Sequence, residues 1–308
     1  MKVLITGCLG HIGSSLIRYI PKKNKFNKIY IIDNFYSNRY SSLFDLDKNA
    51  NYKFINCDLS KNKLENIIKE NIDLVIHLAA RTDAAQSSKF KKEFYSNNFN
   101  ATKNIINFCN IKKAKLVFAS STSVYGPQSN IVDENCSLKE LKPQSPYANV
   151  KLKEEKYIKK NLINSEFLIL RLGTIYGNSP GIRFHTAVNK FCLQSSLDEP
   201  ITVWKTAYNQ VRPYLGLDDF NRAIIHIINN DIELNQVYNL ISHNLSVKQI
   251  TNIIKTYKPN LKIKFVSHEI MNQLSYEVLN NKFVNTKFKF KSNINLEIKK
   301  TLKLLSNI

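Results

Sequence analysis

The stretch KVLITGCLGHIG, residues 2–13, decides the fold of this chain. It begins with a short apolar run, 2–5, which predicts a strand buried on both faces. Three glycines follow at intervals of three residues: Gly7, Gly10 and Gly13. The segment 11–20 has a helical pattern, so we expect a strand, a glycine-rich turn and a helix in succession. The chain has only eight glycines in 308 residues, which makes this early cluster informative.

This strand, turn and helix are typical of a dinucleotide-binding site. Gly7 permits the tight turn, Gly10 lets the backbone approach a pyrophosphate, and Gly13 lets the helix and strand pack closely. Asp33 lies twenty residues after Gly13, at the end of the second apolar run, where a carboxylate binds the 2′-hydroxyl of the adenine ribose. A carboxylate there repels a 2′-phosphate, which favours NAD over NADP. Asp58-Leu59 suits a contact with adenine, although Asp58 alternatively caps the helix expected after it.

Apolar runs and helical patterns alternate through the first half of the chain. The runs occupy 2–5, 29–32, 52–55, 74–78, 116–119 and 167–170, and the helical patterns occupy 11–20, 63–70, 94–110 and 145–162. This order predicts an α/β Rossmann fold, a doubly wound parallel sheet. Beyond it we expect helices at 186–195 and 246–257, the second capped by Ser246, and a strand at 237–240. We therefore expect an NAD-binding domain over 1–172 with a return segment about 212–241, and a smaller C-terminal substrate-binding domain over 173–211 and 242–308.

The composition excludes several classes of protein. Hydrophobic residues make up 43% and charged residues 22% of the chain, so it is a globular protein with a core. No apolar run reaches the ~18–20 residues of a membrane span, and no signal peptide is expected. The five cysteines are scattered, which indicates a reducing, cytoplasmic location, and neither they nor the six histidines show a metal-ligand spacing. The net charge of +21 raises the alternative of RNA binding, but the lysines are spread along the chain as codon bias would spread them.

Several motifs in fixed order make the chain resemble the extended short-chain dehydrogenase/reductases, and within them the NAD-dependent nucleotide-sugar epimerase/dehydratase group. The motifs are TGCLGHIG at 6–13, Asp33, Asp58-Leu59, HLAA at 77–80, SSTSVYG at 120–126, YANVK at 147–151, RLGTIYG at 171–177 and VRPY at 211–214. The resemblance covers about residues 1–290. It implies cofactor contacts from Gly7, Gly10, His11, Ile12, Gly13, Asp33, Asn34, Asp58, Leu59, Leu78, Ala79, Ala80, Tyr147 and Lys151.

The expected catalytic residues are Ser121, Tyr147 and Lys151. Tyr147 and Lys151 are four residues apart and share one helix face. A free phenol ionises near pH ~10 and is a poor base at neutral pH, but a neighbouring ammonium stabilises its phenolate. Ser121 ends the fifth strand, at the edge where open sheets bind ligands, and its hydroxyl can share the substrate proton with Tyr147. Lys151 can also hold the nicotinamide ribose.

The residues after Ser121 distinguish among the reactions of the resembling family. Its dehydratases usually carry an Asp-Glu pair there, and here Thr122 and Ser123 lack carboxylates. Its fucose synthases use a catalytic Cys, and none stands beside Ser121. We therefore expect oxidation at C4 of a nucleoside-diphosphate sugar, followed by 4-epimerisation through a 4-keto intermediate. The alternative is a nucleotide-sugar 4-dehydrogenase that releases the keto sugar, and a non-catalytic RNA-binding Rossmann protein is the alternative from a different class.

The substrate contacts implied by the resemblance are Ser121, Ser123, Thr174, Arg183, Asn189 and Arg212. Arg212 matches an arginine that meets the substrate diphosphate or ribose, whereas Arg183 is equally well an exposed surface residue. Family members often place a further arginine before the segment 276–282, but Gln273-Leu274-Ser275 supply none. The nucleotide and the sugar are left open.

The helices at 94–110 and 145–162 are expected to form a homodimer contact. They carry many large apolar residues: Phe94, Phe99, Ile105, Ile106, Phe108, Val150, Tyr157, Ile158 and Leu162. We expect more apolar area there than one sheet face buries, and such patches usually mark a partner surface. In the resembling family these two helices pair with their copies in a second subunit. The alternative is that all of them pack on their own sheet in a monomer.

Overall fold

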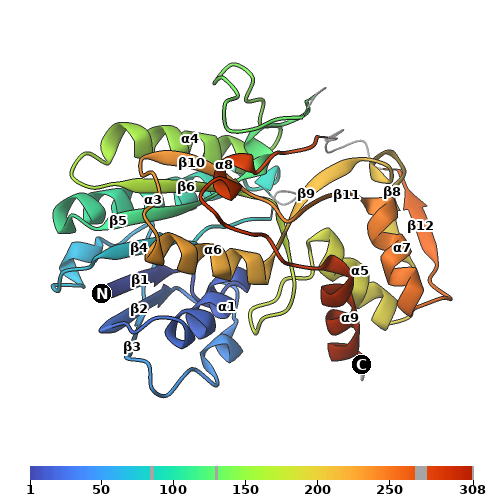
Figure 1. The fold of residues 1–308 in the computed structure, drawn as a ribbon, viewed down its shortest axis with the longest axis horizontal. Helices are drawn as coiled ribbons and strands as arrows, with labels where there is room; N and C mark the ends of the chain where they lie inside the picture. Colours follow the sequence, from blue (N-terminus) through green and yellow to red (C-terminus); the bar gives the residue numbers. More distant parts are fainter. Residues whose placement is uncertain (84–86, 129–130, 268–275, 307–308) are drawn as a thin grey trace.

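A seven-stranded parallel sheet forms the centre of the computed structural model, which describes residues 1–83, 87–128, 131–267 and 276–306 (Figure 1). Its strands are β1 (Lys2–Thr6), β2 (Lys28–Asp33), β3 (Tyr52–Asn56), β4 (Leu74–His77), β5 (Lys115–Ser121), β6 (Phe167–Leu172) and β10 (Gln236–Leu240). Their spatial order is β10-β6-β5-β4-β1-β2-β3, and every neighbouring pair is parallel. The doubly wound sheet predicted from the sequence is therefore confirmed. The order reverses between β1 and β4, which is the point where open sheets of this kind bind their ligands.

Helices cover both faces of this sheet because successive side chains of a strand point to opposite sides. Val3 and Ile5 of β1 belong to a core with α1 (His11–Tyr19) and α6 (Leu217–Asn229). Leu4, between them, belongs to a second core with α3 (Lys91–Lys112) and α4 (Pro146–Asn161). Since both faces are buried, the strands read as continuous apolar runs rather than alternating ones.

A smaller part of the chain lies beside the carboxyl edge of the sheet. It contains a sheet of order β11-β9-β7 and a parallel pair of β8 and β12. The strands are β7 (Thr174–Tyr176), β8 (Ile201–Trp204), β9 (Val211–Gly216), β11 (His243–Ser246) and β12 (Ile263–Val266), and the helices are α5 (Ala187–Ser196), α7 (Val247–Tyr257) and α9 (Ile294–Leu304). Ser246 caps α7 in a capping box with Gln249, as the sequence predicted.

The division into two domains stays a proposal, with one amendment from the packing. Phe283 and Phe288, which the division assigns to the C-terminal domain, pack in the core that contains Val3 and Phe220. The segment around α8 (Asn281–Val284) therefore lies on the large sheet, next to β10 in Figure 1.

The helix predicted over 63–70 is wrong. The structure has only a short 3-10 turn there, Leu64–Asn66. Leu64, Ile68 and Ile72 still turn into the core that contains Leu4, so their apolar spacing is used without a continuous helix. The adjacent β-branched Ile67 and Ile68 and the asparagines around them are poor helix formers, which leaves packing to shape the segment.

Most of the apolar residues of α3 and α4 that were expected to form a partner surface are buried within this chain. Phe94, Phe99, Ile105, Ile106, Phe108, Val150, Ile158 and Leu162 are all buried, and Tyr157 packs edge-on against Phe99. The expectation that these residues leave apolar area outside is therefore wrong. The exposed apolar residues at this pair of helices are others: Phe90, Tyr95, Ile111 and Ile163.

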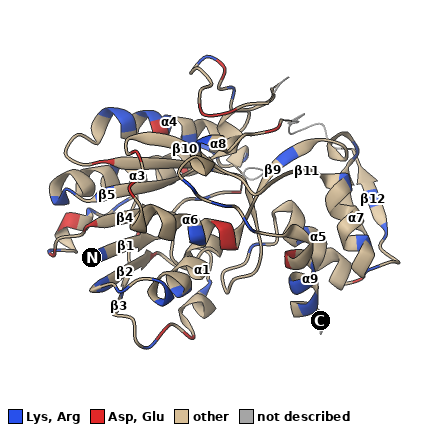
Figure 2. Ribbon diagram, in the orientation of Figure 1, with Lys and Arg blue, Asp and Glu red and all other residues tan. Residues whose placement is uncertain are grey.

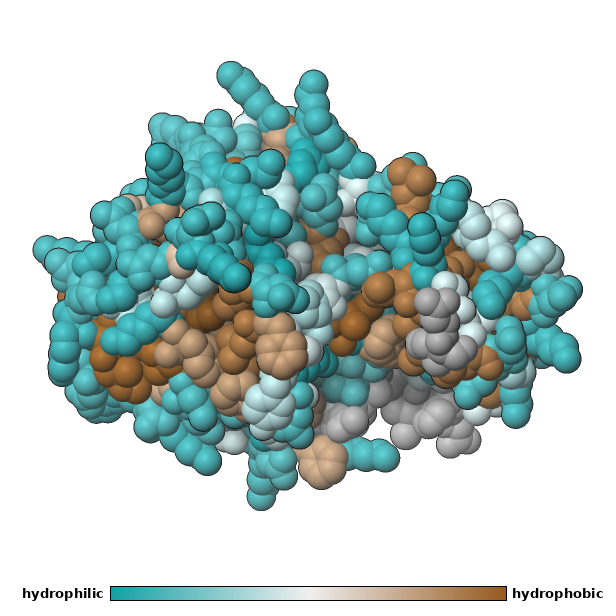
Figure 3. All heavy atoms as spheres, turned by 90° about the horizontal axis from the view of Figure 1, so that it is seen from below, coloured by the Kyte–Doolittle hydropathy of each residue, from teal (hydrophilic) through white to brown (hydrophobic). Residues whose placement is uncertain are grey.

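The chain has a net charge of +21, and among the described residues the basic side chains do not form a separate arm. Figure 2 shows Lys and Arg on helices and strands in both parts of the molecule. Figure 3 shows one face on which apolar atoms come to the surface in patches between hydrophilic ones. Within the described ranges, no helix is both long and apolar enough to cross a membrane.

Candidate functional site

The glycine-rich turn has the shape of a cradle for a pyrophosphate. Gly7 has φ +67°, and a Cβ there would lie 2.7 Å from the backbone N of Ala79. A Cβ on Gly13 would lie 2.2 Å from the carbonyl oxygen of Gly7, so only glycine lets α1 pack this close to β1. The helix begins at His11 directly after Gly10 and points its free N–H groups at the turn. The local geometry therefore fits the diphosphate of a dinucleotide.

Asp33 stands at the carboxyl end of β2 beside this cradle. Its Oδ2 accepts the backbone N–H of Leu9 at 3.1 Å, and its Oδ1 accepts that of Phe35 at 3.0 Å. Burial raises the pKa of the carboxyl above its usual value, while these amides and the charge of Arg39 oppose the rise. The two amides fix the carboxylate where the adenine ribose is expected. Arg39 was not predicted, and it lines the same cleft.

The segment after β3 forms a turn around Asp58 and also lines the cleft. Asp58 Oδ1 accepts the backbone N–H of Ser60 at 2.9 Å and its hydroxyl at 2.6 Å, so Asp58 stabilises a turn. Burial would raise the pKa of Asp58, but the bonds from Ser60 and the charge of Lys61 hold it below its usual value. Asp58 and Leu59 nevertheless line the cleft where adenine is expected. The helix that Asp58 was expected to cap does not form, and Asp58 stabilises this turn instead. The turn is compatible with the contact to adenine.

One cleft of about 870 Å³ connects this cradle with the expected catalytic residues. It is lined by every predicted site residue except Asn189. Asn189, in the first turn of α5, is fully buried and donates its Nδ2–H to the carbonyl oxygen of Arg183 at 3.0 Å. It thus holds the loop before α5 and does not reach the cleft. The sequence did not indicate Trp204, Tyr214 and Tyr276, which line the part of the cleft formed by the smaller sheets.

Ser121 and Tyr147 come from adjacent elements. Ser121 ends β5, and its Oγ accepts the backbone N–H of Ser123 at 3.2 Å and the Ser123 hydroxyl at 2.9 Å. Tyr147 lies in the first turn of α4, whose N-terminus is capped by Ser145 Oγ, the acceptor of the Ala148 N–H at 3.1 Å. Ser123, predicted to contact the sugar, therefore also orients Ser121.

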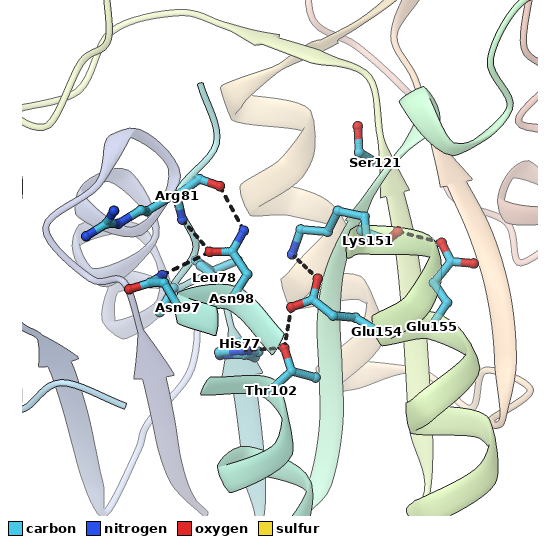
Figure 4. Close-up of polar contacts among 12 residues, drawn as sticks. His77, Leu78, Arg81, Asn97, Asn98, Thr102, Ser121, Lys151, Glu154 and Glu155 are labelled. Atoms are coloured by element: carbon cyan, nitrogen blue, oxygen red, sulfur yellow. Dashed lines mark hydrogen bonds and ion pairs between the residues drawn. The ribbon is translucent and has the colours of Figure 1, made fainter. Parts of the chain in front are cut away.

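Lys151 follows one helical turn after Tyr147 and is buried at the cleft wall. Its Nζ lies 3.2 Å from Glu154 Oε2 and 4.5 Å from the centre of the Phe118 ring. Glu154 is joined through Thr102 to His77, as Figure 4 shows. The sequence placed His77 in the core, which the structure confirms, but it gave no sign of the contacts to Thr102 and Glu154. The one available signal was a glutamate three residues after the lysine on the same helix.

The loop after β4 bridges the cleft. Asn98 of α3 holds this loop from both sides, because its Oδ1 accepts the Arg81 N–H at 2.8 Å and its Nδ2 donates to the Arg81 carbonyl at 2.9 Å. The Arg81 guanidinium lies 4.1 Å from the centre of the Tyr36 ring. Arg81 and Tyr36 line the cleft from the β4 and β2 sides, and neither was predicted.

Arg183 is a half-buried cation in the cleft, which excludes the alternative of an exposed surface arginine. It donates from Nη1 to Thr82 Oγ1, while its Nε is buried without a hydrogen-bond partner. Burial lowers the pKa of the guanidinium, as expected of a charge withdrawn from water. An anionic ligand group in the cleft would balance this charge.

The loop that carries Arg183 is attached to the glycine-rich turn. His11 donates from Nε2 to the carbonyl oxygen of Gly177 at 2.7 Å, and Ser179 donates its hydroxyl to the carbonyl oxygen of His11 at 2.8 Å. The backbone N–H of Gly181 donates to Ser14 Oγ at 2.9 Å. The His11 side chain therefore serves this attachment. The predicted contact Arg212 lies further along the cleft, where its Nη2 donates to Gln210 Oε1 at 3.3 Å. The segment Gln273-Leu274-Ser275 lies outside the described residues.

Comparisons with known proteins agree with this geometry. The sequence model of the NAD dependent epimerase/dehydratase family matches residues 3–240. A dTDP-D-glucose 4,6-dehydratase of Dictyostelium discoideum is 33% identical over 272 residues, which are 82% of this chain and 62% of that protein. A UDP-glucuronate 4-epimerase of Thermodesulfobacterium geofontis is 28% identical over 283 residues, 84% of this chain and 85% of that protein. The crystal structure of the UDP-glucuronic acid 4-epimerase of Bacillus cereus, in complex with UDP-glucuronic acid and NAD, superposes with a TM-score of 0.86 at 23% identity and covers 100% of this chain and 99% of that one.

Proposed function

Because this chain belongs to the NAD dependent epimerase/dehydratase family, whose cofactor is NAD, we propose that it is a 4-epimerase of a nucleoside-diphosphate sugar. The observation that carries the proposal is the joining of Ser121, Tyr147 and Lys151 to the glycine cradle in one cleft. A protein that only binds RNA has no need of these three side chains together. Family membership likewise favours an enzyme over the RNA-binding alternative.

The chemistry assigned to the chain is a proton transfer at the C4 hydroxyl of the sugar. Tyr147 takes this proton as a general base, Lys151 stabilises the resulting phenolate, and Ser121 hydrogen-bonds to the reacting oxygen. When bound, NAD supplies the acceptor and donor of the C4 hydride. After the 4-keto sugar rotates in the cleft and presents its other face, Tyr147 returns the proton to the oxygen on the inverted carbon.

The side chains that follow Ser121 support epimerisation over dehydration. Dehydration needs an acid and a base at the sugar to remove water. Thr122 is buried and donates its hydroxyl to the carbonyl oxygen of Leu172 at 3.3 Å, and Ser123 bonds to Ser121. Neither carries a carboxylate that moves a proton at C5 or C6.

The diphosphate is assigned to the arginines of the loop after β7 and of β9. Arg183 lines the cleft with a half-buried guanidinium, and Arg212 lines it from β9. Thr174 also lines this region and suits a sugar hydroxyl. The relatives named above act on dTDP- and UDP-sugars, so we extend the proposal to a nucleoside diphosphate of this kind.

The test is turnover without added cofactor. The purified chain is incubated with UDP-glucose, UDP-glucuronic acid or dTDP-glucose, and the products are separated by chromatography. An epimerase forms the C4 epimer catalytically, because the hydride is returned to the same sugar. A 4-dehydrogenase releases keto sugar and stops after one turnover for each bound cofactor. Keto product without epimer overturns the proposal in favour of that alternative, and so does 6-deoxy product in favour of dehydration.

A further inference from the structure

We propose that Glu154 is a positioning residue for the Tyr147–Lys151 pair, and that its buried carboxylate fixes the charge of Lys151 and sets the pH at which the pair gives up its protons. The inference rests on the proposed roles of Tyr147 and Lys151. It goes beyond them because Glu154 does not line the cleft and touches no ligand there.

The ion pair itself is withdrawn from water. The Lys151 and Glu154 side chains are 4% and 1% exposed, and Nζ and Oε2 are 3.2 Å apart. The other neighbour of the ammonium is the face of Phe118, at 4.5 Å from the ring centre. A lysine buried among apolar atoms without a counter-charge tends to lose its proton. Glu154 therefore supplies the negative charge that keeps an ammonium beside the catalytic phenol.

A chain of hydrogen bonds ends on the Glu154 carboxylate, and Figure 4 shows its last steps from His77 through Thr102. Its Oε1 accepts the hydroxyl of Thr102, on α3, at 2.6 Å. Thr102 Oγ1 lies 3.3 Å from Nε2 of His77, on β4, and His77 Nδ1 lies 2.7 Å from Thr6 Oγ1, on β1. The Thr6 oxygen in turn accepts the backbone N–H groups of Leu78 and Ala79, both at 3.2 Å.

The direction of these bonds is set by the protonation of His77. Burial, together with the nearby charge of Lys151, lowers the pKa of His77 from 6.5 to about 3, so the ring is neutral and has one N–H. The Thr102 hydroxyl donates its one hydrogen to Glu154 Oε1. Thr102 Oγ1 can therefore only accept a hydrogen bond from His77, so the N–H of His77 is on Nε2. His77 Nδ1 is then the acceptor of the Thr6 hydroxyl. Every donor, from the amides that follow β4 onward, is directed toward the Glu154 carboxylate, which is the arrangement that favours the anion.

The neighbouring carboxylate Glu155 provides a natural contrast. It is on the same helix and equally buried, but its Oε2 accepts the guanidinium Nη2 of Arg171 at 2.7 Å and its Oε1 accepts Arg171 Nε at 3.0 Å. Ser120 donates to the same Oε1. Glu155 thus completes an ion pair on β6 that does not include Lys151.

The charged and titratable groups that face the Tyr147–Lys151 pair come from several elements. On α4 it is Glu154, on β4 it is the neutral His77, and on the loop before α5 it is Arg183, whose charge interacts with Tyr147. From α3 and β5 the uncharged Thr102 and Phe118 face Lys151 and Glu154. Removing the one negative charge in this group makes loss of a proton easier for the pair, whichever of its two members loses it first.

The test measures proton loss directly and needs no sugar. The full chain with NAD+ is labelled with [13Cζ]tyrosine and [13Cε]lysine, and the two signals are assigned by their absence from Tyr147→Phe and Lys151→Arg. Both are followed by NMR against pH in the wild type, in Glu154→Gln and in the matched control Glu155→Gln. Tyr147 and Glu154 are separated by about 10 Å along the helix axis, and a charge at that distance, at an effective dielectric constant of ~20, corresponds to about one pH unit. At the 3.2 Å that separates Glu154 from Lys151, the same charge corresponds to several pH units.

We expect the Lys151 midpoint to fall by several pH units in Glu154→Gln and that of Tyr147 by about one, because the carboxylate touches only the lysine. In Glu155→Gln, whose carboxylate is paired with Arg171, we expect the Lys151 midpoint to fall by much less. Glu154→Asp, which retracts the carboxylate by one methylene, is expected to lie between the wild type and Glu154→Gln, and it decides the matter if Glu154→Gln does not fold. Unchanged midpoints in the Glu154 variants, or equal shifts in Glu155→Gln, overturn the inference. Since no substrate is present, failure of the proposed epimerase activity leaves this result independent.

Discussion

The buried imidazole of His11 makes the free energy of unfolding depend on pH. His11 is 2% exposed, and its Nε2–H is committed to the carbonyl oxygen of Gly177. Burial, and after it the charge of Arg183, lowers the pKa of this ring from 6.5 to about 3. The folded protein therefore holds His11 neutral, whereas the unfolded chain protonates it below its ordinary pKa.

The sign and size of the effect follow from this difference. Above pH 6.5 neither state binds the proton, so the stability is fully present, and it is lost as the pH falls from 6.5 toward 3. Each pH unit in this window costs about 1.4 kcal/mol for one group. Between pH 7.5 and pH 5, His11 alone therefore removes about 2 kcal/mol, a large part of the ~5–15 kcal/mol typical of a folded domain.

Urea unfolding of the wild type and of His11→Gln at pH 7.5 and pH 5, at one ionic strength, isolates this contribution. Glutamine keeps an N–H for Gly177 but does not titrate. We expect the variant to lose about 2 kcal/mol less than the wild type on acidification, because the contributions of the other histidines cancel in the comparison. Equal losses in the two proteins would refute the assignment of a buried neutral ring.

Three further predictions concern the cofactor, the base and the assembly. Tyr147→Phe is expected to bind NAD with nearly unchanged affinity but to turn over ~10²–10⁴-fold more slowly, measured as epimer formation; a rate within a few-fold of wild type contradicts the general base. Asp33→Ala is expected to lower the affinity for NAD about tenfold, measured by calorimetry, because the hydrogen bonds to the ribose are lost. The variant is also expected to bind NADP, because Arg39 then lacks a competing carboxylate. An unaltered protein that already prefers NADP contradicts this reasoning. For assembly we predict a homodimer through α3 and α4, in which the exposed Phe90 and Tyr95 supply the apolar contact. Light scattering at micromolar concentration is then expected to give twice the mass of one chain. A single-chain mass, or a dimer insensitive to charge substitutions on both helices, counts against the prediction.

Features that depend on local pattern were predictable from the sequence. The glycine spacing in 7–13, between a strand and a helix and followed by Asp33, predicted the cradle. The apolar runs predicted the parallel sheet because strands buried on both faces have no polar positions. Asp33, Ser121 and Tyr147 each stand at the end or beginning of such an element, so their meeting at one edge followed from the order of the elements alone.

Only the structure shows which way each side chain of a helix faces and which residues, distant in the sequence, it contacts. The segment 63–70 has a helical spacing of apolar residues, yet packing between β3 and β4 leaves it one turn of 3-10 helix. The apolar residues of α3 and α4 looked surplus because the sequence does not show how much area their own sheet can bury. From the sequence, Arg183 was equally well a substrate contact or an exposed surface residue, and the attachment of its loop to the glycine turn places it in the cleft.

Glu154 and Glu155 show most clearly what cannot be predicted from the sequence. They are adjacent, identical and on one helix, so no property of the sequence separates them. A rotation of ~100° from one residue to the next turns the first toward Lys151 and Thr102, and the second toward Arg171. The partners come from α4 itself, from α3 and from β6, and only the folded chain brings them to the two sides of that helix.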